Sequence, residues 1–152
     1  MQEIRDHADK DYYYFCKYIL NNDLMQEQPH EEMCNFVSTW EENRKKLILV
    51  PRGGFKSTVI TVGYTIWRIL QDRNIRILIS SENHSNSCKY LGEIKQQFET
   101  NTNLHELYGY LKNQDRTGWR KDEIVVNGRT RTGGKEPTVS VASVGQTRVG
   151  MH

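Results

Sequence analysis

Long apolar runs, cysteine pairs and a strong excess of charge are all missing from this sequence of 152 residues. The longest aliphatic run, Leu47–Val50, has four residues. That is far short of the roughly 20 that a membrane-spanning helix needs, so no membrane partner is expected. The charged N-terminus carries no apolar signal-peptide core, which argues against secretion. A net charge of +2 is too small to indicate nucleic-acid binding by itself.

Cysteine is scarce and unpaired in the sequence. Cys16, Cys34 and Cys88 are odd in number, widely spaced and form no C-x-x-C motif, so we expect reduced thiols in a cytosolic protein. His30 and Cys34 lie four residues apart and could share a helix face, but two ligands do not make a metal site.

Hydrophobic periodicity predicts alternating helices and strands along the chain. Helices are expected over residues 6–20, from Pro29 to about 46, over 57–71, around 88–98 and over 104–111. Strands are expected at 46–50, 75–81 and 138–144, and Asn127-Gly128 predicts a hairpin over residues 123–132. This order indicates an α/β fold with a mostly parallel sheet and helices on both faces.

The segment Pro51–Thr58 reads PRGGFKST and lies between the predicted strand 46–50 and the predicted helix 57–71. This order of strand, Gly-rich loop, Lys-Ser and helix is typical of phosphate-binding sites. Such sites bind phosphate oxygens through backbone amides, a lysine and a helix N-terminus. The consensus G-x-x-x-x-G-K-[ST] places glycine at positions 50 and 55, where this chain has Val50 and Phe55. The glycines stand instead at Gly53 and Gly54. The alternative is a Gly-Gly turn before an ordinary helix, with Lys56 solvated.

If a nucleotide binds, the amides from Gly53 to Ser57, including those of Gly54 and Phe55, would cradle the β-phosphate. Lys56 would place its ammonium between the β- and γ-phosphates, and the Ser57 hydroxyl would bind Mg²⁺. Thr58 would cap the helix or contact the α-phosphate. The cofactors expected are therefore ATP and Mg²⁺.

Arg52 stands inside this loop, where its guanidinium could reach a terminal phosphate and stabilise charge there. A surface ion pair is the alternative role. Phosphoryl transfer also needs carboxylates, usually at the end of an apolar strand. No such strand ends in an acidic pair here, because Asp122 and Glu123 precede a predicted strand and 138–144 runs into Gly145.

These residues resemble the N-terminal part of the large terminase subunit of tailed bacteriophages, the ATPase that packages DNA. The loop is similar to that family's deviant Walker A motif, which has an early Arg and a non-Gly residue before the Lys. Further segments that fit are Trp67, Arg76–Ser81, Glu99-Thr100-Asn101, Leu107-Tyr108-Gly109, Trp119, Glu136-Pro137-Thr138 and Gly150-Met151-His152.

The resemblance implies a P-loop NTPase of the ASCE type, a three-layer sandwich that is incomplete at its C-terminus. Residues 1–45 would be a helical lead-in, and 46–152 the nucleotide-binding α/β core before the Walker B strand. The Walker B acids and the family's nuclease domain are not in the sequence, so hydrolysis by this chain alone is not expected. An upstream glutamine contacts adenine in such motors, and Gln26 or Gln28 could serve.

The resemblance also implies partners and a location. Double-stranded DNA, the small terminase subunit and the portal protein would be partners of a homo-oligomeric ring in the bacterial host cytoplasm. Arg129, Arg131 and Lys135 are candidate contacts to the DNA backbone, with solvated charge as the alternative. Other functions stay open: a helicase or small phosphotransferase with the same loop, or a non-catalytic nucleotide-binding or interaction module.

Overall fold

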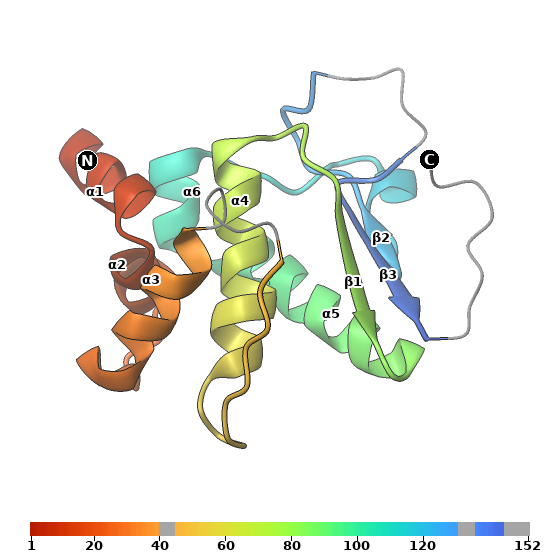
Figure 1. Ribbon diagram of the computed structural model, residues 1–152. Helices are drawn as coiled ribbons and strands as arrows, with labels where there is room; N and C mark the ends of the chain where they lie inside the picture. Colours follow the sequence, from red (N-terminus) through yellow and green to blue (C-terminus); the bar gives the residue numbers. More distant parts are fainter. Residues whose placement is uncertain (40–44, 131–135, 145–152) are drawn as a thin grey trace. The chain divides into compact units, whose positions relative to one another are not determined.

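A computed structural model describes residues 1–39, 45–130 and 136–144 of the chain (Figure 1). It divides into two compact units, Met1–Trp67 and Arg68–His152. The first unit is helical and contains the candidate loop, whereas the second contains the sheet. Within the described residues, no helix combines the length and the apolarity needed to cross a bilayer.

The first unit contains short helices before the loop and one longer helix after it. Their bounds are α1 Gln2–Lys10, α2 Tyr12–Tyr14, η1 Phe15–Ile19, η2 Glu27–Glu31, α3 Glu32–Ser38, η3 Ser57–Gly63 and α4 Tyr64–Gln71, where η1 to η3 have π-helical hydrogen bonding. The last two run on without a break and confirm the helix predicted over 57–71 (Figure 1). The boundary between the units falls inside α4.

The predicted helix 6–20 is interrupted. Asp11 is extended (φ −109°, ψ 101°) and its carboxylate accepts a hydrogen bond from the Tyr14 amide at 2.9 Å. A side chain that can cap a helix stabilises a new N-terminus there, so α1 ends and α2 begins.

The second predicted helix begins at Pro29, as expected. Gln28 is extended (φ −108°, ψ 133°). The predicted end near residue 46 is wrong, because α3 ends at Ser38, Thr39 leaves the helical conformation (φ −78°, ψ 40°), and residues 45 and 46 are not helical. Lys46 donates to the carbonyl of Phe36 and to the hydroxyl of Thr39 at 2.9 Å. It therefore binds the C-terminal end of α3, where a cation is favoured.

Tyr12 and Trp67 hold the N-terminal helices against the helix that follows the loop. Their ring centroids lie 4.9 Å apart. The Tyr12 hydroxyl donates to the carbonyl of Val59, and Trp67 Nε1 donates to the carbonyl of Ala8 at 3.1 Å. Both side chains are buried, so Tyr12 is a core residue, and burial is the main cause that raises its pKa.

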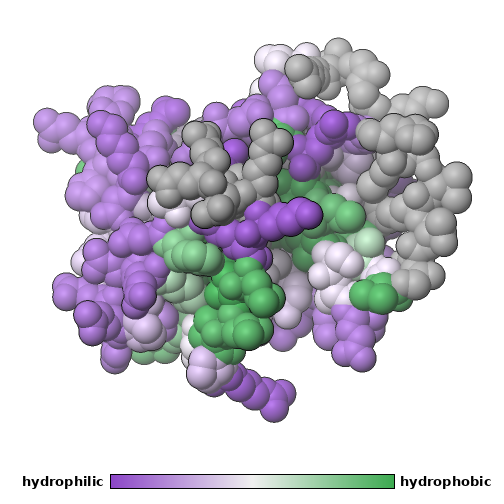
Figure 2. Space-filling model, in the orientation of Figure 1, coloured by the Kyte–Doolittle hydropathy of each residue, from purple (hydrophilic) through white to green (hydrophobic). Residues whose placement is uncertain are grey.

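Residues 46–50 were predicted as the first core strand, but the structure has no strand there. The side chains of Leu47 and Leu49 are 80% and 83% exposed, and Figure 2 shows apolar surface over this segment. Among the described residues no hydrogen bond engages the backbone of 47–50. A β-strand is defined by its hydrogen bonds to a neighbouring strand, and the described residues supply no such partner to residues 46–50.

The second unit has a three-stranded sheet of order β1-β3-β2, built from β1 Ile77–Ser81, β2 Glu123–Ile124 and β3 Val139–Ser143. β1 and β3 are parallel, with Ile79 opposite Val141, and β2 is antiparallel to β3. The helix α5 His84–Thr100 follows β1 and packs on both parallel strands (Figure 1). The strands predicted at 75–81 and 138–144 are thus present and parallel, whereas the predicted series of 46–50, 57–71 and 75–81 lacks its first strand, and the antiparallel β2 makes the sheet mixed.

Two asparagines cap the helices of the second unit. Asn83 accepts from the Asn86 amide at the start of α5, and Asn101 accepts from the Leu104 amide at the start of α6 Thr102–Tyr108. Leu91, Ile94 and Phe98 of α5 are fully buried, as its periodicity predicted. A short 3₁₀ turn, η4 Arg116–Gly118, follows.

The hairpin predicted over 123–132 is wrong in its pairing. β2 pairs with β3, and the amides that follow it donate elsewhere, since Val125 N bonds Gly118 O at 2.7 Å and Asn127 N bonds Leu111 O at 2.8 Å. Gly128 does turn the chain with φ +82°. Residues 131 and 132 of the expected return strand lie outside the described part.

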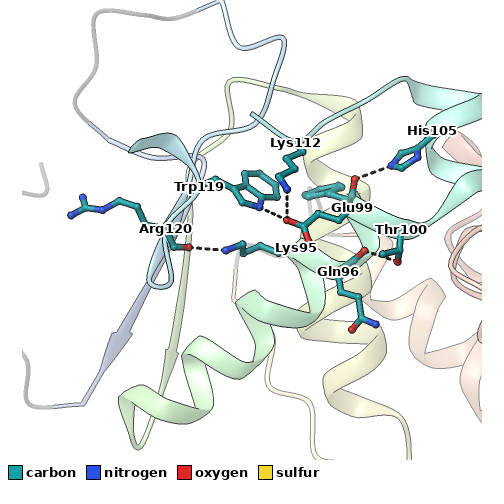
Figure 3. Close-up of polar contacts among 9 residues, drawn as sticks. Lys95, Gln96, Glu99, Thr100, His105, Lys112, Trp119 and Arg120 are labelled. Atoms are coloured by element: carbon teal, nitrogen blue, oxygen red, sulfur yellow. Dashed lines mark hydrogen bonds and ion pairs between the residues drawn. The ribbon is translucent and has the colours of Figure 1, made fainter. Parts of the chain in front are cut away.

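Glu99 and Trp119, two residues that carry the family resemblance, contact each other (Figure 3). Glu99 Oε1 accepts from Trp119 Nε1 at 2.8 Å and from Lys112 Nζ at 3.1 Å. The hydrogen bond from Lys112, followed by that from Trp119, lowers the pKa of Glu99. These contacts attach the segment before β2 to the C-terminal end of α5.

Candidate phosphate-binding loop

The loop begins with a tight turn over Pro51–Gly54, closed by a 3.2 Å hydrogen bond from the Gly54 amide to the Pro51 carbonyl. Gly53, its third residue, has φ +87°, which glycine adopts without a steric penalty. A Cβ on Gly54 would lie 2.4 Å from Cγ1 of Val50. The two glycines therefore have different roles: Gly53 permits the positive φ of the turn, and Gly54 permits close packing against Val50.

Phe55 occupies the position of the second consensus glycine and has a backbone conformation that glycine adopts more readily than any other residue. Its φ is +55°, in the left-handed region. For a residue with a Cβ this conformation is unfavourable by about 1–2 kcal/mol. The backbone at this position thus favours glycine, the consensus residue, although the chain has Phe there.

His30 packs against this strained residue. The His30 and Phe55 rings meet edge to face, with centroids 5.0 Å apart and planes inclined at 81°. His30 is buried, and its Nδ1 accepts from the Gln26 amide at 2.9 Å. The segment Gln26–His30 therefore adjoins the loop, and it includes both glutamines, Gln26 and Gln28, that were considered for adenine contact; both are exposed.

The helix after the loop begins with amides that donate to no described group. Val59 N bonds Phe55 O at 2.9 Å, whereas no hydrogen bond within the described residues engages the amides of Phe55, Lys56 and Thr58. Unsatisfied amides at a helix start attract anions, since the helix dipole adds to their partial positive charge.

A cavity of about 520 Å³ is lined by the nine consecutive residues Val50–Thr58. Its lining contains two cations, Arg52 and Lys56, and no carboxylate. Both side chains are exposed, and neither forms a hydrogen bond or ion pair within the described residues. The surface ion pair considered for Arg52 is therefore not observed there, and Ser57 and Thr58 are half-buried beside it.

All residues predicted for the phosphate site are brought together by the loop, from Arg52 to Thr58. The Arg129 guanidinium donates to the carbonyl of Glu136 at 2.5 Å and is half-buried, so it is bound within its own unit. Arg131 and Lys135 lie outside the described part of the chain. Among the described residues no group of three or more His, Cys, Asp or Glu could hold a metal ion.

Sequence reasoning missed the contact of His30 with Phe55, because His30 was considered only with Cys34 as a metal ligand. Nothing local in the sequence indicates a contact across 25 positions. Comparison of the chain with protein-family profiles, curated proteins and solved structures found no match.

Proposed function

We propose that the loop Val50–Thr58 binds the triphosphate of ATP together with Mg²⁺. The observation that carries this proposal is the cavity formed by one continuous loop, lined by two cations and by helix-start amides that bond to none of the described residues. The positive φ of Phe55 supports it further, because the position is the one where the consensus has glycine.

Each side chain has a defined role in this proposal. Lys56 lies between the β- and γ-phosphates as a mobile positive charge, and Arg52 binds the γ-phosphate. The Ser57 hydroxyl is the protein ligand of Mg²⁺, while Thr58 lies beside the α-phosphate. Backbone amides from Gly53 to Ser57 surround the β-phosphate.

We further propose a P-loop NTPase fold of the large terminase subunit type, acting in the bacterial cytoplasm on double-stranded DNA. The parallel pair β1 and β3 with α5 between them supports this fold class. The exposed Leu47 and Leu49 also support it, since a sheet that included residues 46–50 would cover them. A homo-oligomeric ring with the small subunit and the portal protein belongs to the same proposal.

Hydrolysis by this chain is expected to be slow. The cavity lining offers no carboxylate to hold the hydrated metal or to orient an attacking water. This same observation favours a second candidate, a module that binds nucleotide and uses binding alone as its signal.

The test compares ATP·Mg²⁺ binding by the native chain, Lys56→Ala and Lys45→Ala, measured by calorimetry. Lys45 is an exposed lysine outside the cavity lining and serves as the matched control. We expect Lys56→Ala to weaken binding roughly 10- to 100-fold, since a hydrogen bond to a charged group contributes about 1.5–3 kcal/mol. Lys45→Ala should bind as the native chain does.

Equal affinities for the native chain and Lys56→Ala would exclude the loop as the nucleotide site. Phosphate release in the same samples separates the two candidates. Turnover that DNA stimulates and that Lys56→Ala abolishes supports a motor ATPase, whereas binding without turnover supports the module.

A further inference from the structure

Cys88 and His84 form a thiol–imidazole pair on α5, outside the phosphate site. Cys88 Sγ lies 3.4 Å from His84 Nε2, and the two residues are four positions apart on one helix face. At this distance Nε2 can accept the thiol proton. A base within hydrogen-bond reach is the arrangement that activates cysteine nucleophiles.

The second ring nitrogen of His84 supports a functional role for the pair. Its Nδ1 is buried and has no hydrogen-bond partner among the described residues. An N–H group left in this way is unfavourable by about 1–3 kcal/mol, and such groups are few in folded proteins. No described carboxylate pairs with the ring, so Nε2 stays available to accept from the thiol.

The three cysteines of the chain differ in exposure. The relative exposure of Cys88 is 9%, whereas Cys16 and Cys34 are both at 0%. Burial is the largest cause that raises the pKa of Cys16, which keeps that thiol protonated and unreactive. All three thiols are buried, and Cys88 is the one that keeps some surface for a small reagent to contact.

Both residues of the pair lie within the first two turns of α5. Asn83 caps this end, and the Ser87 hydroxyl donates to the carbonyl of Ala142 in β3 at 2.8 Å. These hydrogen bonds fix the first turn of α5 against the sheet and so hold His84 close to Cys88.

We propose that Cys88 is a modification site for hydrogen peroxide, with His84 as the proton acceptor. Sγ attacks one oxygen of the peroxide, an S–O bond forms and the O–O bond breaks. Sulfur loses two electrons and becomes a sulfenic acid. The departing hydroxide takes the proton that the thiol gave to His84 and leaves as water. The proposal is independent of nucleotide binding by the loop.

The test treats the intact, folded chain with hydrogen peroxide in the presence of dimedone, which traps sulfenic acids, and follows each cysteine by peptide mass spectrometry. Cys16 and Cys34 are internal controls in the same sample. We expect Cys88 to be labelled at least about tenfold faster than either. His84→Gln, which keeps a polar side chain but has no base, should slow labelling of Cys88 by about tenfold or more.

His7→Gln, at an exposed histidine in the other unit, should leave the rate at Cys88 unchanged. Labelling of Cys88 as slow as that of Cys16 and Cys34 would overturn the proposal, and so would a fast rate that His84→Gln does not alter. If His84→Gln does not fold, the comparison of the three cysteines in the native chain decides alone.

Discussion

The imidazole of His30 meets the ring of Phe55 edge to face, with centroids 5.0 Å apart. Phe55 is the one non-glycine residue of the loop whose backbone is in the left-handed conformation. An aromatic contact of this kind contributes about 0.5–1.5 kcal/mol beyond the area it buries. That is comparable with the strain of about 1–2 kcal/mol at Phe55. The contact therefore stabilises a loop conformation that the Phe55 backbone alone would disfavour.

A double-mutant cycle of His30→Ala and Phe55→Ala tests this contact. We expect a coupling free energy of about 0.5–1.5 kcal/mol in urea unfolding, because the two side chains pack on each other. Strictly additive effects would show that the rings do not interact in solution.

Comparing Phe55→Gly with Phe55→Ala isolates the backbone strain, since both variants lose the contact with His30. Only alanine retains a Cβ at φ +55°. We expect Phe55→Gly to be more stable than Phe55→Ala by roughly 1 kcal/mol and to bind ATP·Mg²⁺ at least as tightly. A more stable Phe55→Ala would mean that φ is negative at this position.

Gly63→Ala should destabilise the first unit. A Cβ there would lie 2.8 Å from the Tyr12 hydroxyl, 3.1 Å from Thr58 O and 3.2 Å from Cys16 Sγ. Overpacking of this kind is unfavourable by about 1–3 kcal/mol, and the thermal midpoint should fall accordingly. Gly92→Ala in α5 is the matched control. No atom lies within 4 Å of its Cβ, so helix propensity should stabilise it by roughly 0.5–1 kcal/mol.

Glu99→Gln should remove a pH-dependent part of the stability. Lys112 and Trp119 lower the pKa of Glu99 below its ordinary value of 4.5, so the ionised carboxylate stabilises the native state above that pH. This stabilisation is lost as pH falls through the lower pKa of the folded state. Because the Glu99 side chain is 34% exposed, we expect only roughly 0.5–1 kcal/mol at pH 7.

Urea unfolding of the native chain and Glu99→Gln from pH 7 down to pH 3 measures this effect. The difference between them should shrink as the pH falls below about 4.5, the unfolded value. A difference that stays constant with pH would show that the carboxylate charge is not its source.

Local sequence was sufficient for the helices and for part of the loop. Spacing of Leu91, Ile94 and Phe98 predicted α5, and Pro29 marked a helix start, because helix periodicity and the φ of proline are local properties. The glycines and Lys56 marked the loop in the same way. Asp11 was overlooked as a helix break, although the capping ability of an aspartate is also local.

The sequence by itself determined the approximate positions of most helices and where the cations of the loop stand, because these depend on neighbours within a few residues. Only the tertiary structure decided that β2 pairs with β3, that residues 46–50 pair with none of the described strands, and that His30 packs on Phe55. Strand pairing and aromatic packing join residues distant in the chain, and their free energies depend on which partner is present rather than on local propensity.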